Sequence, residues 1–185
     1  GELVAGFGSM AESWTVSADG LTWTFKLHEG VTWSDGDPVD SADFVYTYNA
    51  INSDLVESPR KYYWEQIESI EAPDPSTVVV TFKQVKCDAL VDLAAGWLPS
   101  HLYAADFSDI MTGPEIDEPR VSAGIFKFQS WARDDNIIVV RNEDYWEGAP
   151  LMDGSITRVV PDAGARLAQL QSVEIDYLEG AQPNQ

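Results

Sequence analysis

The sequence is poor in cysteine and in basic residues, and it contains no long apolar run. Its one cysteine, Cys87, excludes an internal disulfide and any metal cluster built from several cysteines. Only 11 lysines and arginines stand against 31 acidic residues, which gives a net charge of -20. Nucleic acid is therefore not expected as a partner, because phosphate binding needs clustered basic side chains, and an anionic membrane surface would repel the chain. No stretch of 18 apolar residues is present, so the sequence predicts no direct membrane insertion.

The common signatures of catalytic sites are absent too. The sequence has no Gly-x-Ser-x-Gly, no His-Glu-x-x-His and no phosphate-binding loop. His28 and His101 have no nucleophile motif around them, so we interpret both as structural or exposed residues. The acidic loop at 106–120 lacks the alternating oxygen ligands of an EF-hand. Catalytic groups that meet only in space leave no such pattern, yet nothing favours them here. We predict no enzyme activity, no cofactor and no metal site.

Aromatic residues are plentiful: seven tryptophans, seven tyrosines and seven phenylalanines, within a hydrophobic content of 44%. This composition indicates a folded chain of one domain or two small ones. Three of the aromatics are adjacent, Tyr62, Tyr63 and Trp64. Three bulky rings cannot all point inward from one element, so at least one is expected on a cleft wall or at an interface. We therefore take these three as candidate ligand-binding residues.

The stretch from 20 to 48 carries the clearest local signals. Apolar residues alternate with polar ones from Leu21 to Leu27, which predicts a strand with one buried face. A turn at 18–20 would pair it with an upstream strand around Trp14 and Val16. After a second turn at 34–38, Asp40 can cap a helix whose apolar face contains Phe44, Tyr48 and Ile51.

Further elements follow along the chain. Turn residues and β-branched runs predict two more hairpins, a further strand and two short helices. The ranges are strands 67–72 and 77–83 around a turn at 73–76, a helix at 88–95 capped by Asp88, paired strands around 126–128 and 137–141, a strand at 155–160 and a helix at 163–171.

Several of these segments resemble the family 5 extracellular solute-binding proteins, the peptide- and nickel-type receptors of ABC importers. The matching runs are Ala11-Glu12-Ser13-Trp14, Asp19 to Leu27, Gly30 to Val39, Asp43 to Tyr46 and Arg141-Asn142-Glu143-Asp144-Tyr145-Trp146. Two segments depart from the family pattern. Ser122 to Phe128 keeps only Gly124 and two aromatics of a glycine-rich loop, and Val173 replaces the glycine that usually ends the last helix.

The resemblance implies an α+β fold, a lobe of the type II periplasmic binding proteins. We expect a twisted mixed sheet dominated by antiparallel pairs, short helices and an inserted hairpin-rich subdomain. Residues 1–39 and 121–185 would form the central-sheet part of the first lobe, and 40–120 the inserted subdomain. The second lobe would be absent from this chain, as would any signal or lipoprotein segment.

The function implied by the resemblance is solute capture between two lobes and delivery to a membrane permease. Peptide is the expected ligand, although related receptors take nickel complexes, opines or oligosaccharides. Ser122 and Gly124 join the three aromatics as candidate ligand-binding residues. The protein would be an extracytoplasmic monomer, in the periplasm or at the cell surface, where a lipid anchor on the full-length protein could hold it. Two other functions stay open, a stand-alone aromatic-rich glycan-binding module and an interaction domain with no small ligand.

Overall fold

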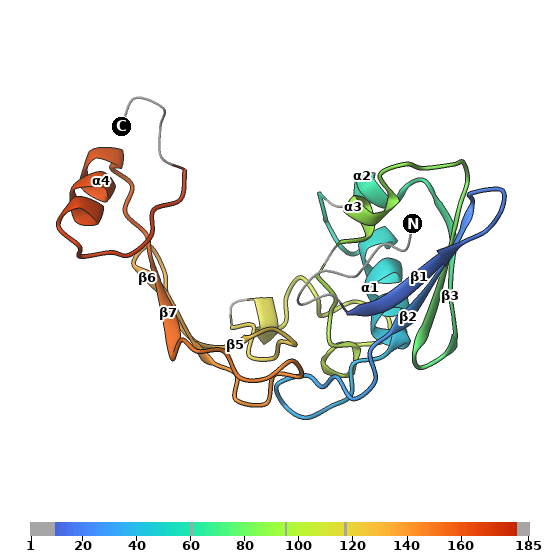
Figure 1. Cartoon of the computed structure of the whole chain (residues 1–185), viewed down its shortest axis with the longest axis horizontal. Helices are drawn as coiled ribbons and strands as arrows, with labels where there is room; N and C mark the ends of the chain where they lie inside the picture. Colours follow the sequence, from blue (N-terminus) through green and yellow to red (C-terminus); the bar gives the residue numbers. More distant parts are fainter. Residues whose placement is uncertain (1–9, 60, 95, 117, 181–185) are drawn as a thin grey trace.

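The computed structural model describes residues 10–59, 61–94, 96–116 and 118–180. Figure 1 shows two regions joined into an open C. We call residues 10–120 the large region and 121–180 the small region. The large region holds a four-stranded sheet in the order β1-β2-β4-β3, and the small region a three-stranded sheet in the order β5-β6-β7. All strand pairs among the described residues are antiparallel, and with the short helices they form the expected α+β fold.

The first hairpin forms where the sequence predicts it. β1 (Ala11–Val16) and β2 (Thr22–Leu27) pair antiparallel. The turn between them is closed by the Ser17 amide, which donates to the Thr22 carbonyl at 2.9 Å. Gly20 adopts a φ of 76°, a left-handed conformation that glycine takes without the steric cost of a Cβ. The aspartate–glycine pair therefore fixes the register of the hairpin.

Helix α1 (Ser41–Asn52) begins at the predicted cap. The Asp40 carboxylate accepts from the Ala42 amide at 2.8 Å, while the Asp43 carboxylate accepts from the Asp40 amide at 3.2 Å. This reciprocal capping box satisfies amides that the helix itself leaves free. The helix runs on to Asn52, one residue beyond Ile51, the last residue of the predicted apolar face.

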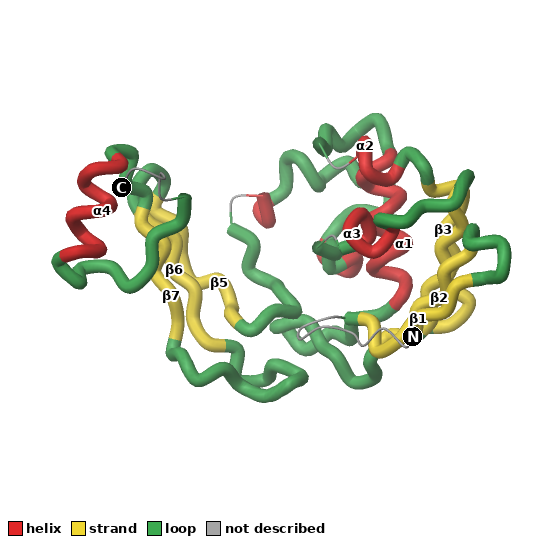
Figure 2. The backbone as a smooth tube through the Cα atoms, turned by 45° about the horizontal axis from the view of Figure 1, so that its top comes forward, coloured by secondary structure: helices red, strands yellow, loops and turns green. Residues whose placement is uncertain are grey.

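The core of the large region lies between its sheet and its helices. β3 (Ile67–Asp74) and β4 (Thr77–Phe82) complete the sheet, and α1, α2 (Lys61–Trp64) and α3 (Ala89–Leu93) cover one face of it, as Figure 2 shows. Burying each large apolar side chain contributes about 1.5–3 kcal/mol. The buried cluster comprises Leu27, Phe44, Ile51, Trp64, Ile67, Val78, Val80, Phe82 and Ala89.

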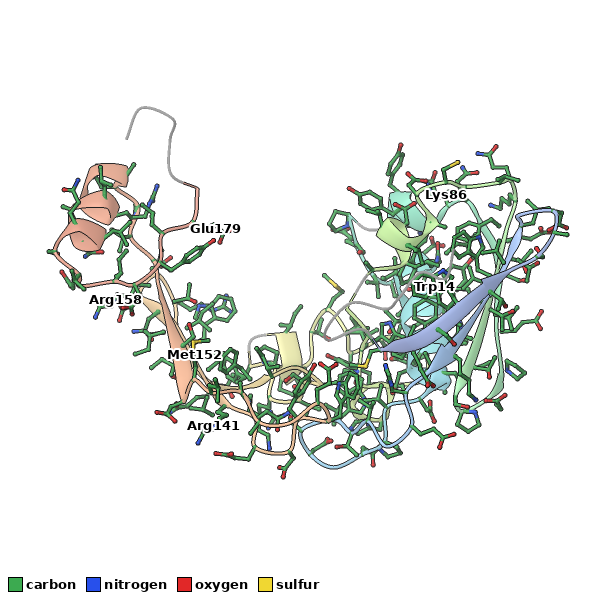
Figure 3. The ribbon with its side chains drawn as sticks, viewed as in Figure 1. Trp14, Lys86, Arg141, Met152, Arg158 and Glu179 are labelled. Atoms are coloured by element: carbon green, nitrogen blue, oxygen red, sulfur yellow. The ribbon has the colours of Figure 1, made fainter. Side chains whose placement is uncertain are left out.

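Short 3-10 turns at Ser100–Leu102 (η1) and Pro114–Ile116 (η2) lead into the small region. There β5 (Phe126–Ala132), β6 (Asn136–Arg141) and β7 (Gly154–Arg158) form the second sheet, followed by α4 (Ala163–Gln171). Both ends of α4 match the predicted helix, and the Asp162 carboxylate caps it by accepting from the Ala165 amide at 2.7 Å. Side chains fill the large region but stand apart around β7 and α4 (Figure 3).

Two details of the structure differ from what was expected. Among the described residues, no strand before residue 40 pairs with a strand of the small region: β2 pairs with β4, which places Trp23 opposite Val80 and Phe25 opposite Val78. Such aromatic and β-branched cross-strand pairs stabilise a sheet, and this pairing joins the first hairpin to the segment predicted as an insertion. The division of the chain into lobe and inserted subdomain stays a prediction. At α3, Asp88 makes no capping bond, because its carboxylate lies 3.0 Å from Lys86 Nζ.

Candidate functional site

The three adjacent aromatics of α2 differ in their exposure, as the sequence predicts. Trp64 is buried, and its Nε1 donates to the Asp92 carbonyl at 2.9 Å. Its ring packs on Phe44 and Tyr48, with centroids 6.0 and 5.8 Å away. Tyr62 and Tyr63 are 72% and 49% exposed, and their rings meet edge to face at 5.7 Å. The helix thus buries one ring and presents two to the surroundings.

A cavity of about 480 Å³ opens beside Tyr63, one of the two exposed tyrosines. It is lined by Pro59, Tyr63, Trp64, Val91 and Asp92. Val91, on α3, is 74% exposed. Figure 1 shows α2 and α3 on the side of the large region that is turned toward the small region. An apolar wall with one carboxylate beneath it suits contact with a partly apolar solute.

A second cavity of about 440 Å³ lies on the other side of Trp64, lined by Tyr48, Asn52, Trp64, Glu65, Gln66, Ile67 and Lys83. Its polar groups are partly engaged already: Lys83 Nζ donates to the Glu65 carbonyl at 2.7 Å, and Asn52 Nδ2 to the Tyr48 carbonyl at 2.9 Å. Burial raises the pKa of Tyr48 further above its ordinary value, and its neutral hydroxyl can donate a hydrogen bond. This cavity is suited to hydrogen bonding rather than apolar packing.

Ser122 and Gly124 lie elsewhere, where the large region meets the small one. The Ser34 amide donates to the Ser122 carbonyl at 2.9 Å, and the Ser122 amide donates back to Ser34 Oγ at 3.2 Å. Ser122 Oγ donates to the Phe126 carbonyl at 2.9 Å. The Gly124 carbonyl accepts from Asn142 Nδ2 at 3.0 Å. Both residues therefore brace the junction through bonds that are already made.

The five predicted residues do not converge on one point. Tyr62, Tyr63 and Trp64 follow the C-terminal end of α1, whereas Ser34, the partner of Ser122, precedes its N-terminal end. A helix of 12 residues is about 18 Å long. The two groups contact different segments: Trp64 packs along α1 on Phe44 and Tyr48, whereas Ser122 is bonded to Ser34 in the loop before the helix.

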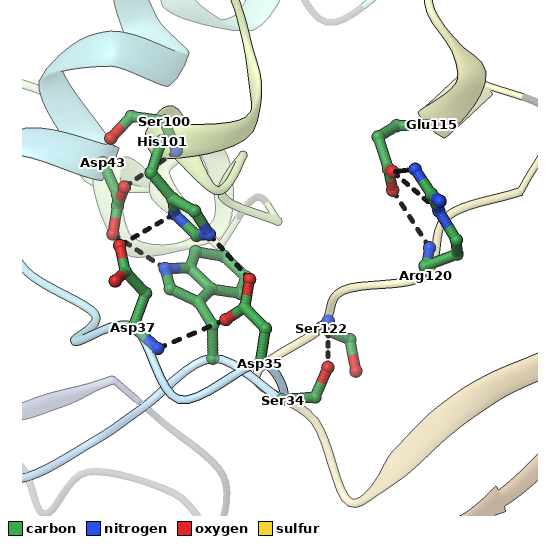
Figure 4. Close-up of polar contacts among 10 residues, drawn as sticks. Ser34, Asp35, Asp37, Asp43, Ser100, His101, Glu115, Arg120 and Ser122 are labelled. Atoms are coloured by element: carbon green, nitrogen blue, oxygen red, sulfur yellow. Dashed lines mark hydrogen bonds and ion pairs between the residues drawn. The ribbon is translucent and has the colours of Figure 1, made fainter.

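A polar network at the junction was not predicted from the sequence (Figure 4). At its centre is Asp43, which is only 3% exposed. One carboxylate oxygen accepts from Trp33 Nε1 at 3.0 Å and the other from the Ser100 amide at 2.9 Å. Together with the Asp40 amide, these donors satisfy a carboxylate that would be costly to bury unpaired. Asp43 thereby ties the start of α1 to the loop before it and to η1.

His101 completes this network. Its Nε2 lies 2.8 Å from Asp35 Oδ2, and its Nδ1 lies 3.3 Å from Asp37 Oδ2. Burial opposes ionisation of Asp35, but the bonds from His101 and from the Asp37 amide outweigh it, so the pKa of Asp35 lies below its ordinary value. The signal in the sequence was the Trp-Ser-Asp-Gly-Asp-Pro turn. It resembles a family motif, but nothing in it names a histidine 66 residues further on.

Two negative findings concern only the part of the chain that the structure describes. No helix there is long and apolar enough to cross a membrane. No group of three or more histidine, cysteine, aspartate or glutamate side chains there is arranged to hold a metal ion.

Comparison with known proteins places the chain clearly. The family model for bacterial extracellular solute-binding proteins, family 5 middle, matches residues 8–185. An ABC transporter peptide-binding protein of Brucella ovis is 31% identical over 172 residues, which cover 92% of this chain and 32% of that protein.

Solved structures agree with this match. The oligopeptide-binding protein AppA of Bacillus subtilis, in complex with a nonapeptide, superposes with a TM-score of 0.81 at 30% identity, over 90% of this chain and 34% of AppA. NikZ of Campylobacter jejuni, in complex with Ni(L-His), gives a TM-score of 0.81 at 26% identity, over 90% of this chain and 33% of NikZ. The chain thus spans about a third of the length of these relatives.

Proposed function

Because the chain belongs to the bacterial extracellular solute-binding proteins of family 5, we propose that it forms part of the receptor of an ABC importer. The match over residues 8–185 carries this proposal, and the relatives are transport proteins rather than enzymes. The same match disfavours a stand-alone glycan-binding module, since it extends over both regions and both sheets. The family is extracellular by description.

The proposed mechanism is closure of two lobes around a solute. A ligand shifts such an equilibrium only by the contacts that it makes better in the closed state than in the open one. The present chain supplies one side of that arrangement. A permease in the membrane would receive the loaded receptor, and the full-length protein would act as a monomer outside the cytoplasm, held at the membrane by a lipid anchor where one is present.

The ligand is proposed to be a peptide. Tyr62 and Tyr63 would contact it directly, with Trp64 as the rigid floor beneath them. Aromatic side chains offer a large contact area at low entropic cost because they have few rotatable bonds. Ser122 and Gly124 would act by holding the junction loop in place, because their hydrogen bonds are directed within the chain.

Calorimetric titration of the full-length protein tests this proposal. Tri- to nonapeptides, Ni(L-His) and an oligosaccharide would be compared, and peptide binding is the expected result. The double change Tyr62→Ser and Tyr63→Ser should weaken peptide binding about tenfold, which corresponds to about 1.4 kcal/mol. Val85→Ser serves as the control, since Val85 is also exposed but lies against Gly20 in the β1–β2 turn.

Two outcomes would overturn the proposal. One is a full-length protein that responds to none of these solutes. The other is a 185-residue chain that binds peptide as tightly by itself as the full-length protein does, because closure between lobes would then be unnecessary.

A further inference from the structure

Both ring nitrogens of His101 face carboxylates. Nε2 lies 2.8 Å from Asp35 Oδ2 and Nδ1 lies 3.3 Å from Asp37 Oδ2 (Figure 4). An ionised carboxylate only accepts hydrogen bonds, and a neutral imidazole carries a single N–H. A neutral ring could therefore serve one aspartate and would turn a lone pair toward the other. Only the doubly protonated imidazolium satisfies both contacts at once.

We propose that His101 is a proton-dependent clasp that positions the junction between the large and small regions. Protonated, it holds Asp35 and Asp37 on the loop before α1. When the ring is neutral it can donate to only one of the two aspartates, so the loop loses one of its two contacts with His101.

The loop transmits this state to the small region through its own hydrogen bonds. Ser34, next to Asp35, exchanges two bonds with Ser122, the second residue of the small region. The other side of the clasp is rigid, because Ser100, next to His101, donates its amide to the buried Asp43. The hydrogen-bonded path from His101 to Ser122 thus runs through the loop before α1, which Trp33 also ties to Asp43.

The charged groups that face the His101 ring are carboxylates. Asp35 and Asp37 face it from the loop, and Asp43 of α1 lies behind it through the Ser100 amide. Arg120, the last residue of the large region, is paired with Glu115 at 2.6 Å. The charged partners of the ring are therefore Asp35 and Asp37.

The second histidine of the sequence lies at the same junction. The ring of His28, just after β2, lies against Trp146 of the small region, with centroids 4.5 Å apart. A protonated imidazole over an indole gains a cation–π interaction. Protonation of His28 would then strengthen the contact between the regions in the same direction as protonation of His101.

The clasp holds only within a pH window. Histidine ordinarily changes its charge between pH 5 and 8, so the clasp is present on the acid side of that change and is lost as the pH rises through it. At the acid end the limit is ionisation of Asp35. Because its pKa is lowered, this carboxylate stays charged as the pH falls until below its ordinary range of about 4. We expect the junction to be held while His101 is protonated and Asp35 is ionised, and released on either side of that window.

Fluorescence energy transfer across the junction tests the proposal without any ligand. One dye is attached to the natural Cys87, which is exposed, and the other to a Tyr177→Cys variant in the small region. The spread of distances in the 185-residue chain should be narrow at pH 5.5 and should broaden as the pH rises to 8. With His101→Gln, which stays neutral but keeps a hydrogen-bond donor, the spread should be broad at both values.

Two further variants show how much His28 and Asp37 contribute to the pH response. His28→Gln should keep the transition with a smaller amplitude. Asp37→Asn should reduce the amplitude of the transition, because one of the two carboxylates that the doubly protonated ring holds is gone. A parent chain with no pH response, or a His101→Gln variant with the parent response, would overturn the proposal.

Nitrogen NMR of the His101 ring in the unsubstituted chain provides a second measurement that does not depend on the folding of variants. Both ring nitrogens should be protonated at pH 6, and a neutral tautomer there would contradict the clasp. The consequence for transport, a pH-dependent ligand affinity, rests on the proposed function. Since neither measurement uses a ligand, the clasp can fail while the receptor function stands, and the reverse.

Discussion

Both regions contain an antiparallel sheet, but only the large region packs apolar side chains into a buried core. The large region encloses nine mutually packed apolar residues between its sheet and its helices. Among residues 121–180, all of which the structure describes, only Ala123, Asn142 and Tyr145 are buried, and all three lie near the junction. No described residue of β5, β6, β7 or α4 is buried. Regular secondary structure is therefore no measure of stability: one region has a core and the other has hairpin pairing alone.

The exposed apolar side chains of the small region point to the same conclusion. Leu151 is fully exposed, and four others are more than half exposed, namely Met152, Ile156, Val173 and Tyr177. Apolar side chains left in water contribute little to stability. We expect the small region to open locally at a much lower free energy than the large region, and the predictions below test this difference.

The largest effect is expected at the centre of the core. Trp64→Ala should lower the free energy of unfolding of the large region by about 3–5 kcal/mol, through lost burial and the cavity left behind. The same substitution at Trp131 in β5, which is partly exposed and stacks on Arg133, should cost less than about 1 kcal/mol. Urea denaturation followed by hydrogen exchange of β4 and β6 amides measures both. Equal costs would refute the contrast between the regions.

Asp43 should be the next most sensitive position. Asp43→Ala leaves the Trp33 indole and the Ser100 amide without their acceptor, at a cost of about 2–4 kcal/mol. Asp54→Ala is the matched control, because Asp54 is fully exposed and lies 3.8 Å from its partner Lys61. Thermal unfolding should separate the two variants widely. A loss for Asp43→Ala no greater than that for Asp54→Ala would show that the network contributes nothing to folding.

A gain in stability is expected at the end of α4. Val173 has a φ of 60°, a left-handed conformation that is strained for a β-branched residue. Its amide donates to the Leu170 carbonyl at 3.1 Å, and the Glu174 amide to the Gln169 carbonyl at 2.9 Å, a helix ending that glycine normally occupies. Val173→Gly should stabilise the small region by roughly 0.5–1 kcal/mol.

The control for that gain is Asp134→Gly in the β5–β6 turn. Asp134 has a φ of 62°, but aspartate tolerates this conformation far better than valine. Hydrogen exchange of β6 and α4 amides should therefore slow more in Val173→Gly than in Asp134→Gly. The reverse order would mean that the backbone at 173 carries no strain.

The smallest effect on stability is expected at the candidate ligand contacts. Tyr62→Ser and Tyr63→Ser should change the free energy of unfolding by less than about 0.5 kcal/mol each, because both rings are largely exposed. Thermal unfolding of the two variants measures this. A large loss would place these rings in the scaffold and remove them as candidate contacts.

Much of the local structure was predictable from the sequence. The turn at Gly20, the cap at Asp40 and both ends of α4 follow from side chains within four residues of each feature. The adjacent aromatics were also predictable as a group of which some members must be exposed. These features share one cause, since each depends on groups that are close along the chain.

The candidate site was only half predictable. The sequence singled out Ser122 and Gly124 but gave no reason to place them beside Ser34, which is 88 residues away. It gave no sign that Trp64, rather than either tyrosine, would be the buried ring. It also presented His101 as an isolated histidine, although the structure places it between two aspartates.

By itself, the sequence determined the elements, their caps and turns, and the family to which the chain belongs. Only the tertiary structure decided that the first hairpin joins β4, that the small region lacks a core, and that both histidines lie at the junction. The physical reason is the separation along the chain over which each interaction acts. Backbone propensity and capping act over a few residues, whereas strand partners, burial and charge pairs depend on which distant segments meet when the apolar faces are buried together.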